Sequence, residues 1–240
     1  LAYDPYLPGA DILITGLLEA AKKSEVKSRE VNEAIALLKN WNFEVSVNSI
    51  EMTLAQFYLR EYLRSGKIPR MDGNKRISRL GRFNYMSKIS NHNERLDIFQ
   101  NSLNKIKSDF GSWKTPWGEF NRYQRNDGSI TQEFSDNKPS IPVGMASGSW
   151  GALASYGTRF GKDTKRQYGT SGNSFVAVVE FGDKVKAKSM LAGGQSGDPE
   201  SPHFSDQAQR YADRDFKDVA YYKEDVLKRA KTIYHPGTRK

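Results

Sequence analysis

The sequence predicts an α+β fold in which a helical first half precedes a strand-rich second half. Apolar residues recur at spacings of three and four up to about residue 112, which is the period of amphipathic helices. From Trp113 onward this period disappears, and glycine, proline and aromatic residues become more frequent. Two β-prone runs then follow each other late in the chain, and helices followed by strands are typical of the α+β class. We therefore divide the chain into a helical segment, 1–112, and a β-rich segment, 113–240, with a final hairpin at about 168–192 and a C-terminal helix.

In the first segment, capping residues and apolar stripes define four helices. They are expected over Ala10–Lys23, from the N-cap Ser28 to about Asn40, from Asn48 with Glu51 as a capping-box pair to Gly66, and over His92–Asp109 between Asn91 and Gly111. Gly16 inside the first helix costs about 1 kcal/mol relative to alanine, so we expect a close packing neighbour there. The basic, glycine-punctuated stretch 68–89 predicts a surface excursion with some helix.

The second segment is expected to carry short strands. Trp117–Tyr123 alternates like a strand, and the nearly all-apolar run Phe175–Phe181 predicts a strand covered on both faces. Gly182-Asp183 is a turn signal, and lysines alternate with small residues over 184–189, so the next strand should show one face to water. The tail Tyr221–Tyr234 predicts an amphipathic helix. Its inward residues should be Val226, Leu227 and Ile233.

Composition limits the partners and the chemistry of the chain. Of the 240 residues, 37% are hydrophobic and 27% charged, which is enough apolar material for a core. No apolar run approaches the about 18 residues of a membrane span, and Leu1–Pro5 has neither the basic nor the apolar region of a signal peptide. Cysteine is absent, so disulfides, thiolate metal sites and a cysteine nucleophile within the chain are excluded. The net charge of +9 permits an anionic partner.

A glycine-rich corner follows the last predicted strand and carries a resemblance to a known family. Gly194-Gln195-Ser196-Gly197-Asp198-Pro199 is followed by Ser201-Pro202-His203-Phe204 and Asp206-Gln207, and is preceded by Gly169–Phe175. This block closely resembles the end of the β chain in the penicillin acylase family of N-terminal-nucleophile hydrolases. The spacing Leu38…Trp41…Ser49…Leu54 is similar to another family segment, although Asn42 stands where the family usually has aspartate. We expect Trp41 to be a core anchor between two helices.

The resemblance implies an amide hydrolase of the penicillin or acyl-homoserine-lactone acylase type, whose helices and strands form an αββα sandwich. In that family the nucleophile is a serine, threonine or cysteine exposed by self-cleavage of a precursor, and its free α-amino group acts as the base. Leu1 offers no such group, and Gly128-Ser129 and Gly148-Ser149 lie in loop contexts. We therefore expect a C-terminal fragment that carries no catalytic, cofactor-binding or metal-binding residue and is inactive alone.

The same resemblance sets the expected partners. They are the remainder of the acylase precursor, meaning the α chain and the N-terminal part of the β chain, and a small-molecule acyl amide as substrate of the whole enzyme. No membrane is expected as a partner, and an exposed strand edge permits a homodimer. Because family members are usually exported, the resemblance implies a periplasmic or secreted protein made as a zymogen.

Three alternatives compete with these interpretations. Asp198, His203 and Asp206 form a candidate metal triad, but aspartate-rich turns are commoner than metal sites. Ser201 with His203 and Asp206 is a poorer candidate for a catalytic triad, because residues so close in sequence converge only through an unusual turn. We expect His203 to brace the corner instead.

The second functional hypothesis is an independent basic module for nucleic acid or another anionic polymer, in which Trp113, Trp117, Tyr123 and Trp150 stack on rings. The dense basic patch Lys67–Arg82 is expected to be solvated.

Overall fold

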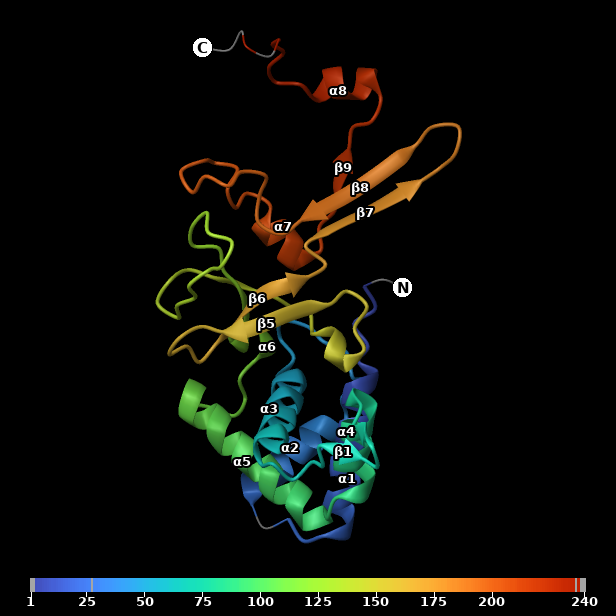
Figure 1. Ribbon diagram of the computed structural model, residues 1–240, viewed down its shortest axis with the longest axis vertical. Helices are drawn as coiled ribbons and strands as arrows, with labels where there is room; N and C mark the ends of the chain where they lie inside the picture. Colours follow the sequence, from blue (N-terminus) through green and yellow to red (C-terminus); the bar gives the residue numbers. More distant parts are fainter. Residues whose placement is uncertain (1–2, 27, 236, 238–240) are drawn as a thin grey trace. The chain divides into compact units, whose positions relative to one another are not determined.

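The computed structural model describes residues 3–26, 28–235 and 237, and it divides into two units, Leu1–Asn173 (unit 1) and Ser174–Lys240 (unit 2) (Figure 1). Leu1 and Ala2 lie outside the described residues. Both units mix helices and strands, which confirms an α+β protein. This division does not test whether the two parts belong to one larger acylase domain, so that remains a prediction.

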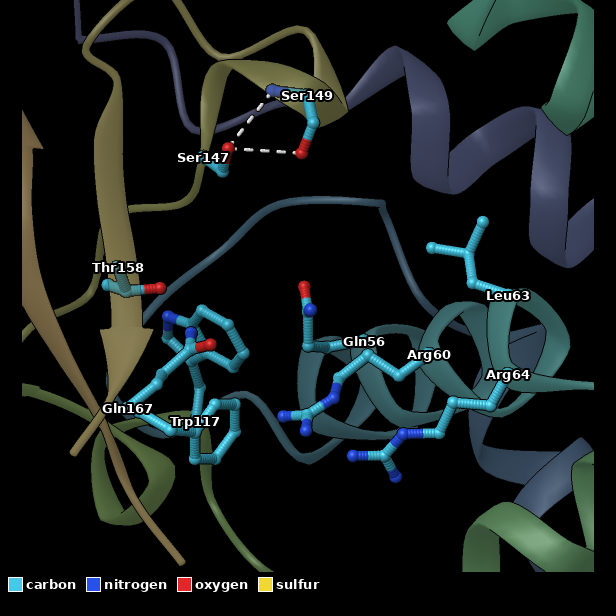
Figure 2. Close-up of a pocket in the computed structure, with 10 residues that line it drawn as sticks. Gln56, Arg60, Leu63, Arg64, Trp117, Ser147, Ser149, Thr158 and Gln167 are labelled. Atoms are coloured by element: carbon cyan, nitrogen blue, oxygen red, sulfur yellow. Dashed lines mark hydrogen bonds between the residues drawn. The ribbon is translucent and has the colours of Figure 1, made fainter. Parts of the chain in front are cut away.

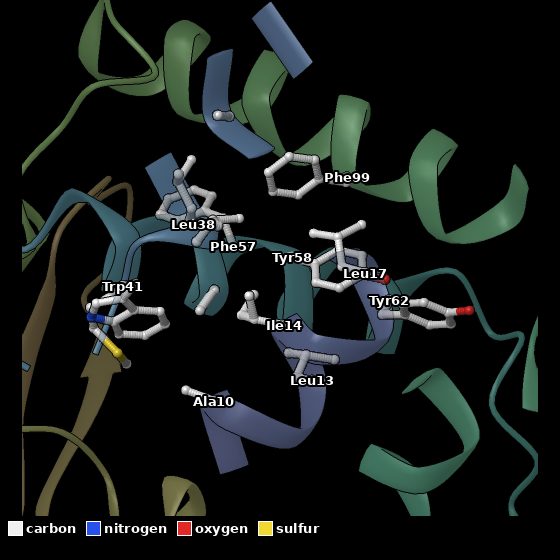
Figure 3. Close-up of a cluster of buried hydrophobic side chains, with 14 of the residues drawn as sticks. Ala10, Leu13, Ile14, Leu17, Leu38, Trp41, Phe57, Tyr58, Tyr62 and Phe99 are labelled. Atoms are coloured by element: carbon white, nitrogen blue, oxygen red, sulfur yellow. The ribbon is translucent and has the colours of Figure 1, made fainter. Parts of the chain in front are cut away.

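Unit 1 is organised around four long helices, α1 (Pro8–Lys23), α2 (Arg29–Lys39), α3 (Ile50–Arg64) and α5 (His92–Phe110). Their apolar stripes meet in one core, where side chains of α1 such as Leu13 and Leu17 face α3 and α5 (Figure 3). Ser28 caps α2 by accepting the Val31 N–H, and α5 ends at Gly111 in the left-handed region with φ of 84°. Trp41 is only 8% exposed, which confirms the predicted anchor. The helices therefore form where the periodicity predicted them, within about two residues at each end.

Gly16 lies where α1 crosses the π-helix η1 (Tyr85–Ile89). A Cβ at Gly16 would collide with the main chain of Ser87, so no side chain fits between the two elements. The carbonyl of Gly16 accepts a hydrogen bond of 3.1 Å from the buried guanidinium of Arg95. The predicted close neighbour of this glycine is thus confirmed.

The stretch 68–89 is only in part the surface excursion that we expected. It holds a small hairpin of β1 (Met71–Asp72) and β2 (Lys75–Arg76), then α4 (Arg79–Asn84) and η1. Phe83 and Met86 are buried in the core of unit 1, at 4% and 0% exposure. The sequence did not predict this burial, because only three of the described side chains in this glycine- and arginine-rich segment are buried, those of Phe83, Met86 and Ser87.

Two local predictions in unit 1 are wrong at the level of single residues. The N-cap of α3 is Ser49, not Asn48, because the Ser49 hydroxyl accepts the Met52 N–H at 3.1 Å. The predicted strand Trp117–Tyr123 starts as a helical turn, α6 (Trp117–Phe120), and only β3 (Asn121–Tyr123) is extended. The turn forms because the N–H groups of Trp117 and Gly118 bond to the carbonyls of Ser49 and Val47, which a continuous strand could not reach.

A four-stranded sheet completes unit 1. Its order is β4-β3-β6-β5, with β3 and β6 parallel and the outer pairs antiparallel. The remaining members are β4 (Ile141–Pro142), β5 (Tyr156–Phe160) and β6 (Gln167–Gly172), and the turn η2 (Gly148–Trp150) precedes β5. The first part of the predicted hairpin region 168–192 therefore belongs to this sheet, where β6 pairs with β5.

Unit 2 contains the predicted hairpin. β7 (Phe175–Glu180) pairs antiparallel with β8 (Lys186–Leu191), and β9 (Lys217–Val219) adds to the other side of β8. The prediction that the apolar strand is covered on both faces is wrong, since Phe175 is 64% and Val178 60% exposed. β7 is one of the two edge strands of this sheet, and α7 (Ala208–Asp213) packs against β8 instead. Its sequence is that of a covered strand, but no described element of unit 2 covers it.

The C-terminal helix is shorter than predicted and buries nothing. It is α8 (Lys223–Arg229), and Val226 and Leu227 are 47% and 48% exposed. Ile233 lies beyond the helix and is also exposed. The expected inward orientation of these three residues is therefore wrong, since an amphipathic pattern only orients side chains when another element lies against the helix.

Candidate functional site

A cavity of about 400 Å³ lies in unit 1 beside α3 (Figure 2). Gln56, Arg60 and Arg64 line it and are spaced by four residues, so they share one face of the helix. The facing wall is supplied by residues far along the chain: Trp117 from α6, Ser147 and Ser149 at η2, Thr158 and Phe160 from β5, and Gln167 from β6. The cavity thus forms only when the helices and the four-stranded sheet of unit 1 come together.

Arg60 stacks on aromatic rings. Its guanidinium carbon lies 4.1 Å from the ring centre of Phe160 and 5.7 Å from that of Phe120. A cation over a ring face is attracted by the ring quadrupole. Figure 2 shows the side chains of Arg60 and Arg64 extending from α3 in the same direction. The cavity therefore presents two guanidinium groups along one wall.

Hydrogen bonds hold the other walls in place. The indole N–H of Trp150 donates to Oε1 of Gln56 at 2.9 Å, which leaves the amide N–H groups of Gln56 as donors. The indole N–H of Trp117 donates to the Met145 carbonyl at 3.1 Å, and the Ser149 hydroxyl donates to that of Ser147 at 3.0 Å. The bond from Trp150 fixes the orientation of the Gln56 amide, whose N–H groups lie beside the guanidinium groups of Arg60 and Arg64 in the cavity wall. Such a set of N–H donors suits a negatively charged group.

The glycine-rich corner lies in unit 2 and is held by main-chain bonds. The N–H of Ser196 donates to the His203 carbonyl at 3.1 Å, and the N–H of Gln207 donates to the Gly193 carbonyl at 2.8 Å. At Gly194 a Cβ would collide with the carbonyl oxygen of His203, so only glycine fits. The corner is therefore a tightly closed loop rather than an open site.

The polar residues of the corner pair locally. Nδ1 of His203 lies 2.9 Å from Oδ2 of Asp206, which agrees with the expected bracing role. The Ser201 hydroxyl accepts the main-chain N–H of His203 at 3.2 Å, while Asp198 accepts the N–H of Glu200 at 3.0 Å. Among the residues that the structure describes, no group of three or more histidine, aspartate or glutamate side chains is arranged to hold a metal ion. The structure thus brings His203 and Asp206 together, and leaves Ser201 and Asp198 engaged with neighbouring main chain.

The stacking platform of the nucleic-acid hypothesis is contradicted. Trp113, Trp117 and Trp150 are 6%, 1% and 1% exposed, so their rings pack in the protein and cannot stack on bases. Tyr123 is half-buried, and burial raises the pKa of its hydroxyl. The basic patch Lys67–Arg82 lies largely on the surface, and Lys67 pairs with Glu94 at 3.2 Å. Aromatic residues of a sequence pattern are core residues here, not ligand contacts.

The arginine cavity was not predicted from the sequence. The signal that could have found it is the four-residue spacing of Gln56, Arg60 and Arg64 next to the buried face of α3. That spacing alone is common on solvated helix faces. What distinguishes Arg60 is the ring of Phe160, which lies on a strand about a hundred residues later.

Comparisons with known proteins match the chain to one family and to proteins named as acylases. The profile of the penicillin amidase family matches residues 1–228. Acyl-homoserine lactone acylase PvdQ of Pseudomonas savastanoi pv. phaseolicola is 29% identical over 100 residues, which are 41% of this chain and 13% of the relative. PvdQ of Pseudomonas syringae pv. syringae is 30% identical over 96 residues, which are 40% of this chain and 12% of the relative. The chain thus matches about an eighth of the length of these curated relatives.

Proposed function

Since the chain belongs to the penicillin amidase family, we propose that it is part of an enzyme that cleaves an acyl amide into a carboxylic acid and an amine. The observation that carries the proposal is the family match over residues 1–228. The similarity to proteins named acyl-homoserine lactone acylases supports an N-acyl amide as the substrate. The pocket that selects the acyl group lies, on this proposal, in the remainder of the protein.

The proposed place of this chain in the enzyme is the C-terminal part of the β chain. The helices of unit 1 and the paired strands β7 and β8 would contribute to an αββα sandwich, a proposal supported by the α+β content and the antiparallel pairing. The nucleophile would be the first residue of the β chain, with its own α-amino group as base, outside these 240 residues. In support, Ser129 lies in a loop and Ser149 in the turn η2, and neither opens a strand.

The test uses the intact gene product that contains this chain. Incubation with N-acyl-homoserine lactones of graded acyl length and with a simple aryl-acetyl amide should release amine and acid in equal amounts, measured by an amine-reactive dye and by liquid chromatography. The N-terminus of the larger processed subunit should be serine, threonine or cysteine, and its replacement by alanine should abolish the release. The 240-residue chain alone should be inactive. An unprocessed product that releases no amine from any of these substrates contradicts the proposal.

We propose that the remainder of the acylase precursor covers β7. Its exposed apolar residues, Phe175, Val178 and Val179, and its unpaired edge support a missing neighbour, because natural sheets rarely leave an apolar edge open. Val178→Lys in the intact gene product is then expected to destabilise it by about 2 kcal/mol, since a charge would replace a buried valine. Urea denaturation measures the change.

Ile130→Lys, in the loop after β3, is the matched control, because this β-branched side chain is fully exposed in the structure. It is expected to change the free energy of unfolding by less than about 0.5 kcal/mol. Equal small effects of both variants would mean that β7 stays in water. If size-exclusion chromatography shows a dimer that Val178→Lys dissociates, a second copy covers the strand instead.

We also propose a periplasmic or secreted location, which the family resemblance supports. In the described part of the chain, every helix is too short or too polar to cross a lipid bilayer. Fractionation of cells that express the intact gene product checks the proposal, and its recovery only with the cytoplasmic fraction would contradict it.

A further inference from the structure

Arg60 carries a positive charge that its surroundings do not balance. Nη1 of its guanidinium is buried and makes no hydrogen bond to any described residue. Burial, followed by repulsion from Arg64, lowers the pKa of Arg60 to about 10, so the group remains cationic at neutral pH. A buried charge without a partner is costly, and buried arginines are normally paired or hydrogen-bonded.

The nearby carboxylates are already engaged elsewhere. Glu61 forms an ion pair of 2.7 Å with Arg64, and Asp109 forms one of 2.6 Å with Lys105. Of the ten cavity-lining residues drawn in Figure 2, two are arginines and none is acidic. The rings beside Arg60 partly offset its desolvation but cannot accept two parallel N–H bonds as a carboxylate does.

The cavity beside Arg60 has the size and the donors that an anion with an apolar body needs. Its volume of about 400 Å³ is within the range of small-molecule sites. Arg60 and Gln56 supply N–H donors along one wall, while Phe160, which is 36% exposed, supplies aromatic surface. This combination favours a carboxylate attached to a ring or an alkyl chain, because the flat guanidinium matches the two oxygens of a carboxylate.

We propose that this cavity is a carboxylate-binding site in which the guanidinium of Arg60 is the principal ligand. The carboxylate has two possible sources, a free small acid or an aspartate or glutamate side chain from the rest of the gene product. The proposal does not rest on the acylase activity, so it stands or falls separately from the proposed function.

The first arm of the test uses benzoate as the probe and benzamide as its neutral counterpart. Isothermal titration of the intact gene product should show benzoate binding about tenfold or more tightly than benzamide, because only the carboxylate pairs with Arg60. Arg60→Gln should weaken benzoate binding by a similar factor. Arg29→Gln is the matched control, since the Arg29 side chain is 91% exposed, and it should change binding less than about twofold.

The second arm detects a carboxylate that the protein itself supplies, which would keep benzoate out. Pairing with Arg60 lowers the folded-state pKa of that carboxylate, so its stabilising effect is present at neutral pH and is lost as the pH falls through the lowered value. The urea midpoint of the wild type should then exceed that of Arg60→Gln at neutral pH, and the gap should close below about pH 4. Arg60→Lys, which keeps the charge without the planar fork, replaces Arg60→Gln if the latter does not fold.

The two arms together decide the proposal. Selective benzoate binding that Arg60→Gln removes identifies a free acid, and a pH-dependent gap without benzoate binding identifies an internal carboxylate. The proposal is overturned if benzoate binds no better than benzamide and the gap between wild type and Arg60→Gln does not change with pH.

Discussion

Replacing Gly16 with alanine is expected to destabilise the protein by about 2 kcal/mol, although alanine is the better helix former. The added Cβ would meet the main chain of Ser87 in η1, so α1 and η1 would have to separate. Alanine in place of glycine inside a helix gains about 1 kcal/mol, and forced overpacking costs about 1–3 kcal/mol or more. The cost lies at the upper end here because the obstacle is backbone rather than a movable side chain. Urea denaturation followed by circular dichroism measures the difference.

Gly197→Ala is the matched control for this substitution. Gly197 is exposed, and a Cβ there would meet no atom within 4 Å. Its replacement should leave the urea midpoint nearly unchanged. Equal midpoints for Gly16→Ala and Gly197→Ala would show that α1 and η1 are not in close contact.

The case of Gly16 shows which parts of the fold the sequence predicts well. A helix-period stripe with capping residues predicted α1, α2, α3 and α5, because these signals are local and act within one turn. An unfavourable glycine inside such a stripe then indicated a close neighbour, which η1 supplies. The identity of that neighbour could not be predicted, since a π-helix with only two core residues has no period of its own.

The strand β7 shows that a local sequence pattern predicts extended structure but not burial. Its apolar run correctly predicted extended structure and pairing with β8. Burial is different, because it depends on whatever packs against the strand, and Val178 is 60% exposed in the described chain. The same reason explains α8, whose apolar residues have no opposing element. At both elements the sequence predicts an apolar contact surface but does not identify what packs against it.

The candidate site was the least predictable part, because its chemistry arises from residues far apart in the chain. An arginine on a helix is normally solvated, and nothing local to Arg60 suggests otherwise. The stacking of Arg60 on Phe160 depends on how the sheet of unit 1 packs against α3. The position of the serine hydroxyls at η2 in the cavity wall depends on the same packing. Conversely, the tryptophans for which we considered stacking on bases are core residues. Large rings are buried where neighbouring elements pack against them.

Arg95 is the position where we expect substitution to lower the free energy of unfolding most. The chemically similar lysine should not be better tolerated there than methionine. The residue is 2% exposed, and its guanidinium donates to the carbonyl of Gly16 at 3.1 Å, to the carbonyl of Ser90 at 2.8 Å and to the Ser90 hydroxyl at 3.1 Å. These bonds join α1 to the start of α5. Arg95→Lys keeps a buried charge but can reach only part of this set, whereas Arg95→Met removes the charge together with the donors.

The balance of these effects predicts that Arg95→Lys is at least as destabilising as Arg95→Met, with both losing about 2–5 kcal/mol in urea denaturation. A buried acceptor costs about 1–3 kcal/mol wherever the lost Arg95 donor was its only hydrogen-bond partner. The lysine variant adds the cost of an incompletely bonded ammonium, while the methionine variant recovers the desolvation of the charge. Arg29→Lys and Arg29→Met, at a side chain that is 91% exposed, should both stay within about 0.5 kcal/mol of the wild type. A lysine variant as stable as the wild type would mean that one ammonium group can join α1 to α5, and that the planar fork of Arg95 is dispensable.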